Sequence, residues 1–269
     1  MLLSVNLNKI ALLRNSRGSN YPNLENFALK ALDMGAEGIT LHPRPDHRHA
    51  TSDDVLHLSK IVKDYGAEFN IEGNPFEEKS GDYLGFNELI KICEPTQATL
   101  VPDTLDQITS DHGWTSGDHD ENLMSTILLL RSYANRVSLF IDPNIESVDY
   151  AKSLAADSIE LYTEDYANSY KSNDVSSFGL VEGYKEVIIH AKSLGLRVNA
   201  GHDLNLENLP ALKALNLIDE VSIGHAIIVD ALNFGFEDTI KRYIQILSLI
   251  HISEPTRRYA ISYAVFCLK

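Results

Sequence analysis

The sequence predicts an α/β fold, specifically a TIM (β/α)8 barrel with extra helices. Eight short apolar runs alternate with amphipathic stretches, a pattern typical of parallel strands covered by helices on both faces. The length of 269 residues fits one barrel, which typically uses about 250 residues. Two successive runs stop on Gly-His, at His202 and at His225, where such a barrel keeps its functional residues.

The apolar runs give the expected strands, and the stretches between them give the expected helices. The expected strands span residues 2–8, 37–42, 68–73, 97–102, 136–142, 158–163, 197–200 and 220–223. The expected helices span residues 24–34, 51–65, 83–93, 121–134, 145–155, 175–194, 206–215 and 226–247. Asn23 is a suitable N-cap for the first helix and Gly35 a suitable stop.

Two connections are long and polar, at residues 103–120 and 168–174. Long connections without periodicity in compact domains are usually functional or mobile. An open dinucleotide-binding sheet is the weaker alternative, because no G-x-G-x-x-G follows the first strand.

We expect residues 1–247 to form a single catalytic barrel domain. Residues 248–269 show no clear helical or strand period, and they carry Pro255 and an Arg-Arg pair in an otherwise acidic chain. We interpret this atypical tail as a read-through or cloning scar, with a native C-terminal arm as the alternative.

The composition limits the partners. A net charge of −15 argues against nucleic acid and anionic membrane as partners, because both require basic patches. A phosphorylated substrate stays compatible, since a few local Arg, His and backbone N–H groups can outweigh the global field. Cys93 and Cys267 are too few for a disulfide framework. With a first strand favoured over a signal peptide and no apolar run long enough for a membrane helix, the expected location is the cytoplasm.

Candidate proton carriers stand at the ends of the second and third expected strands. Glu72 leaves an apolar run, so burial would raise the pKa of its carboxyl towards neutrality; an ion pair with a nearby Lys or Arg is the alternative. His42 opens the segment 42–49, which also supplies Arg44 and His49 and is stiffened by two prolines. The alternative is a solvated charged loop. His47 and Arg48 are treated as bystanders.

Candidate phosphate contacts stand at the ends of the first, seventh and eighth strands. His202 and His225 follow glycines, and backbone N–H groups at such turns bind phosphate where a helix begins. Arg17 lies on a Gly-bounded loop and could clamp a phosphate of its own or a neighbouring subunit. The alternatives are that Gly201 and Gly224 serve only the turns and that Arg17 is an ordinary surface charge. Further polar residues expected at this rim are Asn6, Asn8, Thr109, Asp142 and Thr163.

Together these segments resemble the pyridoxine 5′-phosphate synthase family over about residues 3–247. The blocks that carry the resemblance are VNLNKIA (5–11), RNSRG (14–18), GITLHPR (38–44), DHRH (46–49), NIE (70–72), VSLFID (137–142), VNAGH (198–202) and IGHAII (223–228). The resemblance implies a barrel with additional helices, no metal, no organic cofactor and a homo-octamer. It implies a ring-forming condensation, of the transferase class, between 1-deoxy-D-xylulose 5-phosphate and 3-amino-2-oxopropyl phosphate in vitamin B6 biosynthesis.

The resemblance also implies residue roles. His42 and Glu72 match the family's proton acceptors, and His202 matches its proton donor. The residues that match contacts to the amino-ketone phosphate are Asn6, Arg17, His202 and Asp203. The residues that match contacts to the pentulose phosphate are Arg44, His49, Thr109, Gly224 and His225. Asn8 and Lys9 stand where an Asp-His pair is common, and Lys9 can still meet an anionic group. Asp203 stands where glycine is common.

Two other functions compete with this hypothesis. A metal-dependent hydrolase on the same barrel would use His42, Glu72, His202 and His225 as ligands, although the first strand ends Asn-Leu-Asn rather than His-x-His. Stoichiometric zinc in the purified protein would favour it. A non-catalytic phosphate-ligand binder is the second alternative, and phosphate release that needs both substrates together would exclude it.

Overall fold

Eight parallel strands close into a barrel. The computed structural model describes residues 1–107, 109–117, 120–171 and 176–248. The strands pair in chain order, and β1 also pairs with β8, which closes the sheet. The strands are β1 (Leu2–Asn6), β2 (Gly38–Leu41), β3 (Glu68–Gly73), β4 (Gln97–Leu100), β5 (Arg136–Ile141), β6 (Ser158–Tyr162), β7 (Arg197–Gly201) and β8 (Glu220–Ile223). The predicted (β/α)8 barrel is confirmed.

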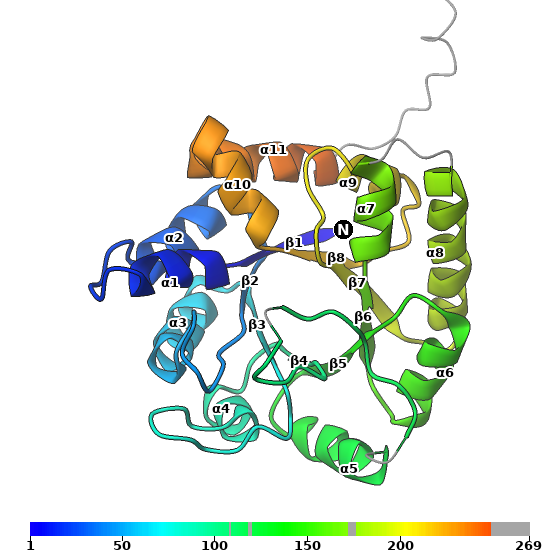
Figure 1. The fold of residues 1–269 in the computed structure, drawn as a ribbon, viewed down its shortest axis with the longest axis horizontal. Helices are drawn as coiled ribbons and strands as arrows, with labels where there is room; N and C mark the ends of the chain where they lie inside the picture. Colours follow the sequence, from blue (N-terminus) through cyan, green and yellow to red (C-terminus); the bar gives the residue numbers. More distant parts are fainter. Residues whose placement is uncertain (108, 118–119, 172–175, 249–269) are drawn as a thin grey trace, which may run out of the picture.

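Helices form a ring around the barrel (Figure 1). They are α1 (Asn8–Asn15), α2 (Leu24–Asp33), α3 (Ser52–Tyr65), α4 (Phe86–Cys93), α5 (Asp120–Leu130), α6 (Ile145–Ser153), α7 (Glu164–Lys171), α8 (Ser176–Ser193), α9 (Leu209–Ala214), α10 (His225–Phe234) and α11 (Phe236–Ser248). Within the part of the chain that the structure describes, no helix combines the length and the apolar character that crossing a bilayer requires.

Side chains that suit helix ends fix several of these boundaries. The Asn23 side chain accepts a hydrogen bond from the backbone N–H of Asn26, which confirms the predicted N-cap of α2. Thr51 and Asp54 form a reciprocal capping box at the start of α3. Gly66 ends α3 with a φ of +84°, a conformation that glycine adopts without steric cost.

Several expected boundaries were wrong. The first strand ends at Asn6 rather than at residue 8, and α1 follows at once; exposed Leu12 and Leu13 hide the helical period of this segment. The expected polar loop at 168–174 overlaps the end of α7, of which Tyr166 and Ala167 are buried.

The single helix expected at 226–247 is two helices. Gly235, with a φ of +78°, separates α10 from α11. The expected helices at 83–93, 121–134 and 206–215 are shorter than predicted, as the bounds of α4, α5 and α9 show. Gly85, with a φ of +89°, delays the start of α4 to Phe86. The expected tail falls on residues 249–269, which lie outside the described residues, and Ser248 is the last residue of α11.

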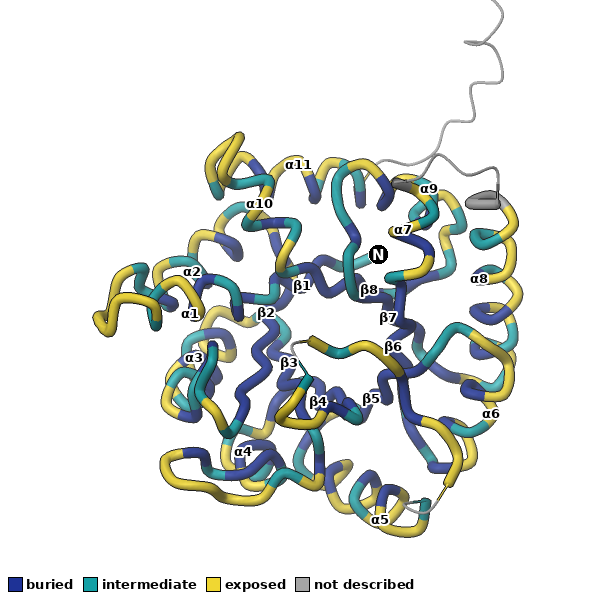
Figure 2. The backbone as a smooth tube through the Cα atoms, in the orientation of Figure 1, coloured by how far each residue is buried: buried dark blue, intermediate teal, exposed yellow. Residues whose placement is uncertain are grey.

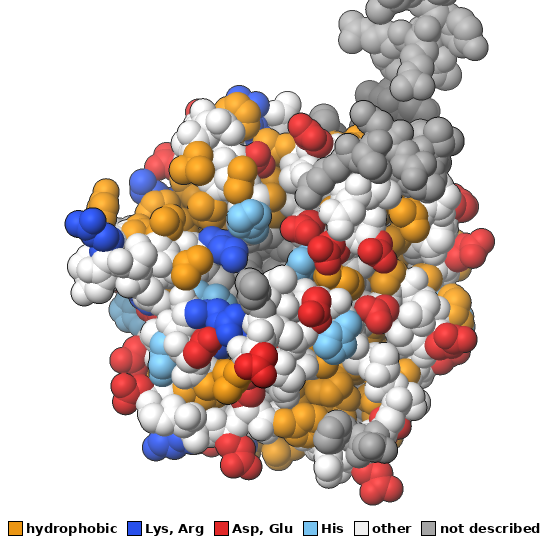
Figure 3. All heavy atoms as spheres, in the orientation of Figure 1, with side chains coloured by type: hydrophobic (Ala, Val, Ile, Leu, Met, Phe, Trp, Pro, Cys, Tyr) orange, Lys and Arg blue, Asp and Glu red, His pale blue; other side chains and the backbone are white. Residues whose placement is uncertain are grey.

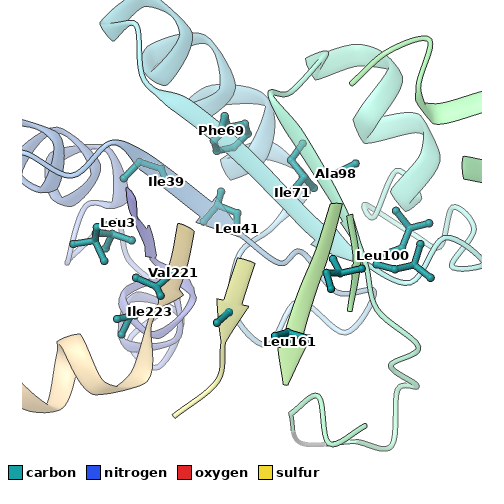
Figure 4. Close-up of a cluster of buried hydrophobic side chains, with 14 of the residues drawn as sticks. Leu3, Ile39, Leu41, Phe69, Ile71, Ala98, Leu100, Leu161, Val221 and Ile223 are labelled. Atoms are coloured by element: carbon teal, nitrogen blue, oxygen red, sulfur yellow. The ribbon is translucent and has the colours of Figure 1, made fainter. Parts of the chain in front are cut away.

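The strands sort apolar and polar side chains to opposite faces. On β3, Phe69 and Ile71 belong to the hydrophobic core between the barrel and the helices, whereas Asn70 makes hydrogen bonds across the barrel interior. Figure 4 shows outward-facing members of this core on β1, β2, β3, β4, β6 and β8, among them Ile39 and Val221. Figure 2 shows the strands buried, with exposed residues on the outer helix faces and the loops. The apolar core therefore surrounds the barrel.

The barrel interior is polar and hydrogen-bonded. Thr99 Oγ1 donates to Asn70 Oδ1 at 2.9 Å, and Gln97 Nε2 donates to Thr99 Oγ1 at 3.1 Å. Asn199 Nδ2 and Arg136 Nε both donate to Gln97 Oε1, at 3.0 and 2.7 Å. Barrels of this class usually fill their interior with branched apolar side chains. The interior below the mouth of this barrel is instead largely polar, although core residues such as Leu204 and Ile223 also line the cavity.

Ion pairs close the opposite end of the barrel. Arg136 Nη2 pairs with Glu68 and lies 3.2 Å from Glu220 Oε2. Arg197 Nη2 lies 3.3 Å from the same oxygen of Glu220. A buried carboxylate without a partner would destabilise the folded state. The two arginines therefore allow Glu220 to lie at this end of the barrel.

The outward-facing core should carry the stability. Leu139 on β5 is fully buried, and Leu139→Ala should lower the free energy of unfolding by about 2–5 kcal/mol, because the substitution leaves a cavity. Leu128→Ala on α5, where the side chain is half exposed, is the matched control and should change it by less than about 0.5 kcal/mol. Chemical denaturation measures both, and equal effects would contradict the placement of the core.

Candidate active site

A cavity of about 530 Å³ opens at the carboxyl ends of the strands. Most of the residues predicted for the site line it, namely Asn6, Asn8, Lys9, His42, Arg44, His49, Glu72, Thr109, His202, Asp203, Gly224 and His225. Arg17, Asp142 and Thr163 do not line it. Asp142 instead accepts a hydrogen bond from the backbone N–H of Gly113, and Thr163 donates to the turn after β7. Arg17 is exposed beyond the end of α1. Figure 3 shows His, Lys and Arg side chains gathered around a hollow near the centre of this face. The structure thus brings together residues from the first to the eighth strand.

Glu72 lies on the floor of the cavity, beside His42. Glu72 Oε2 is 3.9 Å from His42 Nδ1, and Asn6 Nδ2 and Asn70 Nδ2 each donate to the carboxylate at 3.4 Å. Burial, then the charges of Glu160 and Asp103, raise the pKa of Glu72 well above its ordinary value. A carboxyl group with a raised pKa can carry a proton at pH values at which an ordinary carboxyl group is ionised.

His42 is held as a neutral imidazole. Burial lowers the pKa of His42 well below its ordinary value, and the positive charge of Arg44 lowers it further. Burial and the charges of Arg44 and Lys9 lower the pKa of the neighbouring His49 to about 3. A neutral imidazole has one nitrogen with a free lone pair, so His42 is suited to accept a proton.

Asn8 fixes the backbone at His42. The Asn8 side-chain oxygen accepts a hydrogen bond of 3.0 Å from the backbone N–H of His42. The backbone N–H of Asn8 in turn donates to Asn6 Oδ1 at 3.0 Å. An oxygen acceptor is what this position needs, and a carboxamide supplies one as an aspartate would. Asn8 therefore joins the ends of β1 and β2.

The connection between β4 and α5 is tied to the loop after β2. Arg44, which is almost fully buried, pairs with Asp103, and Ser110 Oγ donates to Asp103 Oδ2 at 2.8 Å. Arg48 donates to the carbonyls of Gln107 and Leu105 at 2.6 and 2.8 Å. Arg48, expected to be a bystander, lines the cavity and holds this connection over the mouth.

His202 stands opposite His42 on a turn after β7. Its Nε2 lies 3.2 Å from Thr109 Oγ1, on the β4–α5 connection. Its ring meets the ring of Tyr162 edge-on, with centroids 4.9 Å apart. The β4–α5 connection and the end of β6 thus both contact the imidazole.

Gly224 and His225 begin α10. Gly224 is the N-cap and His225 the first helical residue. A Cβ at Gly224 would lie 3.1 Å from the Cβ of Asn6, so the close approach of β1 requires glycine. The first backbone N–H groups of a helix lack intrahelical partners and favour anions. This end of the cavity is therefore suited to a phosphate group.

Sequence reasoning missed three acidic residues around the cavity. Asp103 pairs with Arg44, Glu164 lines the cavity and accepts from Tyr162, and Glu160 lies in the barrel interior below Glu72. The alternation within residues 158–162 (SIELY) indicates that Glu160 faces the barrel interior, because the apolar Ile159 and Leu161 on either side of it face the core. Nothing in the sequence indicates the long-range partner of Asp103.

The residues proposed for a metal-dependent alternative do not form a ligand group. In residues 1–107, 109–117, 120–171 and 176–248, no three His, Cys, Asp or Glu side chains are arranged to hold a metal ion. The choice between a metal-dependent hydrolase and a synthase rests on the family comparison rather than on this absence.

The fold and the site define a class, a (β/α)8-barrel protein with acidic, basic and imidazole side chains gathered at one mouth. Within that class, the chain belongs to the family described as pyridoxal phosphate biosynthesis protein PdxJ, whose model matches residues 3–249. A pyridoxine 5′-phosphate synthase of Cytophaga hutchinsonii is 48% identical over 90% of this chain and 97% of its own length. One from Porphyromonas gingivalis is 45% identical over 92% of this chain and 99% of its own.

Solved structures support the fold alone. A thiamine phosphate pyrophosphorylase from Pyrococcus furiosus matches 91% of this chain and 95% of its own with a TM-score of 0.58 at 12% identity. A phosphoribosylanthranilate isomerase from Thermotoga maritima matches 92% and 98% with a TM-score of 0.55 at 13% identity.

The buried Glu160 should make stability depend on pH. Burial and the charge of Glu220 raise the pKa of Glu160 to about 8, from 4.5 in an unperturbed chain. The folded state therefore binds this proton more tightly than the unfolded state. Its stabilising contribution is complete below about pH 4.5 and is lost as the pH rises through about 8. Glu160→Gln, which stays neutral, should gain stability relative to the unsubstituted protein by on the order of 1 kcal/mol or more between about pH 5 and pH 8.5.

Urea denaturation at the two pH values measures this gain. Glu186→Gln on α8 is the control, because Glu186 is exposed, and its effect should be the same at both pH values. A Glu160→Gln effect that does not change with pH would contradict the raised pKa.

Proposed function

We propose that the chain is a pyridoxine 5′-phosphate synthase, which condenses 1-deoxy-D-xylulose 5-phosphate with 3-amino-2-oxopropyl phosphate in vitamin B6 biosynthesis. The observation that carries this proposal is the pairing of buried Glu72 with neutral His42 under a cationic rim, in a chain of the PdxJ family. Neither a hydride carrier nor an activated water is required for such a condensation.

The reaction proceeds through proton transfers. The amine of the amino-ketone attacks the pentulose ketone, and loss of water gives a Schiff base. Proton removal by Glu72 and His42 leads to loss of one phosphate. An aldol-like closure and a dehydration, with His202 as proton donor, complete the pyridine ring. The cavity supplies groups that can give protons to the substrate and groups that can take them from it, because Glu72 has a raised pKa and His42 a lowered one.

Two phosphate groups are held at separate parts of the rim. Arg44, His49, Thr109 and the start of α10 at Gly224 and His225 bind the pentulose phosphate. Asn6, His202, the backbone of the turn at Asp203, and Arg17 bind the amino-ketone phosphate. Lys9 adds a positive charge at the cavity wall, and Asn8 keeps His42 in place. Because anions bind best to charged donors and to helix N-termini, each group has suitable partners.

The active form is a homo-oligomer, and an octamer is what the family resemblance implies. Four exposed apolar side chains lie on the neighbouring helices α1 and α10, namely Leu12, Leu13, Val229 and Leu232. Contiguous apolar surface of this kind typically marks a protein–protein contact. Arg17, at the end of α1 and outside its own cavity, then reaches the cavity of a neighbouring subunit.

Residues 1–247 act as one catalytic domain in the cytoplasm. The family match covers nearly this span. The free thiol of Cys93 suits a reducing compartment.

Glu72→Gln tests the catalytic proposal. The substitution keeps the shape of the side chain but removes its ability to carry a proton, so product formation should fall by about a hundredfold or more. The assay supplies both substrates, follows inorganic phosphate and then detects the pyridine product by ultraviolet absorbance.

Glu88→Gln on α4 is the matched control, since Glu88 is exposed and pairs only with its helix neighbour Lys91 among the ion pairs of the described residues; it should retain full activity. Phosphate release that needs only one substrate, or none at all, would overturn the proposed reaction. Binding of both phosphates without turnover would favour a non-catalytic ligand binder.

Leu232→Asp tests the oligomer. Leu232 is 83% exposed in the single chain, so a charge there should cost the folded subunit little and should dissociate the assembly. Light scattering after gel filtration measures the mass. Ile189→Asp on α8 is the control, since Ile189 is exposed on another helix and should leave the mass unchanged. An unchanged mass for Leu232→Asp would refute this contact surface.

A further inference from the structure

The turn after β7 holds two consecutive residues in a conformation that favours glycine. His202 has a φ of +88° and Asp203 a φ of +57°. Side chains with a Cβ are disfavoured there, and such strain persists only where surrounding structure imposes it. Asp203 therefore occupies a position where glycine would be less strained.

Neighbouring side chains impose this turn. Thr163 Oγ1 donates to the carbonyl of Gly201 at 2.9 Å and also to the carbonyl of His202. Asn208 Nδ2 donates to the carbonyl of Asp203 at 3.0 Å. The backbone is thus fixed from β6 on one side and from the start of α9 on the other.

The Asp203 carboxylate faces one nitrogen of the catalytic imidazole. Asp203 Oδ2 lies 3.5 Å from His202 Nδ1. Nδ1 is buried and has no hydrogen-bond partner among the described residues. On the other side of the ring, Nε2 faces the hydroxyl of Thr109 at 3.2 Å, within the cavity wall. Distances of this kind are often long in unliganded proteins and shorten when the substrate binds.

We propose that Asp203 is a positioning residue for His202. Its carboxylate keeps the ring proton on Nδ1, so that Nε2 is the nitrogen that exchanges protons with the substrate. The kinetic part of this inference rests on the proposed function, whereas the position of the ring proton does not.

One arrangement of protons satisfies all the neighbours of the ring. With the proton on Nδ1, that nitrogen donates towards the Asp203 carboxylate, and the lone pair of Nε2 accepts from the Thr109 hydroxyl. With the proton on Nε2, a bare Nδ1 lone pair would face a carboxylate, which is repulsive.

The ring proton can be located directly in the unsubstituted protein. Nitrogen NMR of protein made with ¹⁵N-labelled histidine distinguishes the two neutral forms of His202, and its signals are assigned by their loss in His202→Gln. We expect the proton on Nδ1, and we expect it to move largely to Nε2 in Asp203→Gly. A proton on Nε2 in the unsubstituted protein would overturn the proposal.

Kinetics give the second arm of the test. Asp203→Asn and Asp203→Gly should lower kcat by about tenfold or more, with KM for both substrates within about twofold, because the group acts through His202. Since glycine relieves the strained turn, the Tm of Asp203→Gly should not fall, and lost activity cannot be ascribed to unfolding. A kcat equal to that of the unsubstituted protein in Asp203→Gly would also overturn the proposal.

A second Asp–His pair provides the control. Asp149 lies 2.6 Å from His190 Nε2 on the surface helices α6 and α8, outside the cavity lining. Asp149→Asn should leave kcat and the His202 signals unchanged. If the unsubstituted protein releases no phosphate from the two substrates but carries the proton on Nδ1, the proposed function fails while the assignment of the proton stands.

Discussion

The strict two-residue alternation of the strands is the constraint on which the rest of the structure depends. It sends one set of side chains to an apolar layer under the helices and the other set to a hydrogen-bonded interior. The fold therefore draws its hydrophobic stabilisation from outside the barrel. Because the interior is not needed for that purpose, it can hold Glu160, Glu220 and Arg136.

The interior in turn sets the properties of the mouth. Glu72 shares a poorly solvated space with Glu160, and its burial together with the charge of Glu160 favours the protonated form of Glu72. Burial, and then the nearby cations, lower the pKa values of His42 and His49, which remain neutral. Glu72, with a raised pKa, and His42, with a lowered pKa, therefore lie side by side. Such a pair arises from environment, since the residue types alone would place both groups at their ordinary pKa values.

The sequence predicted the barrel because its strands are short, apolar and regularly spaced. It failed at α1, where Leu12 and Leu13 are exposed and obscure the helical period, and at α7, where polar residues cover a buried Tyr166. The residues of the rim were predictable because they follow strands. The pairing of Arg44 with Asp103, 59 residues apart, was not, since it depends on how the β4–α5 connection folds back. The turn at Asp203 likewise emerged only from backbone geometry.

The overall charge of the chain and the local charges at its mouth act at different distances. A phosphate ester meets a field set by a net charge of −15 while it is far away, and it meets Lys9, Arg44 and Arg48, beside acidic residues such as Glu164, only on arrival at the cavity. Salt weakens long-range forces first, within a screening length of about 8–10 Å. Physiological ionic strength thus removes the distant repulsion while preserving the close attraction, so encounter with anionic ligands depends on the local rim rather than on the overall charge.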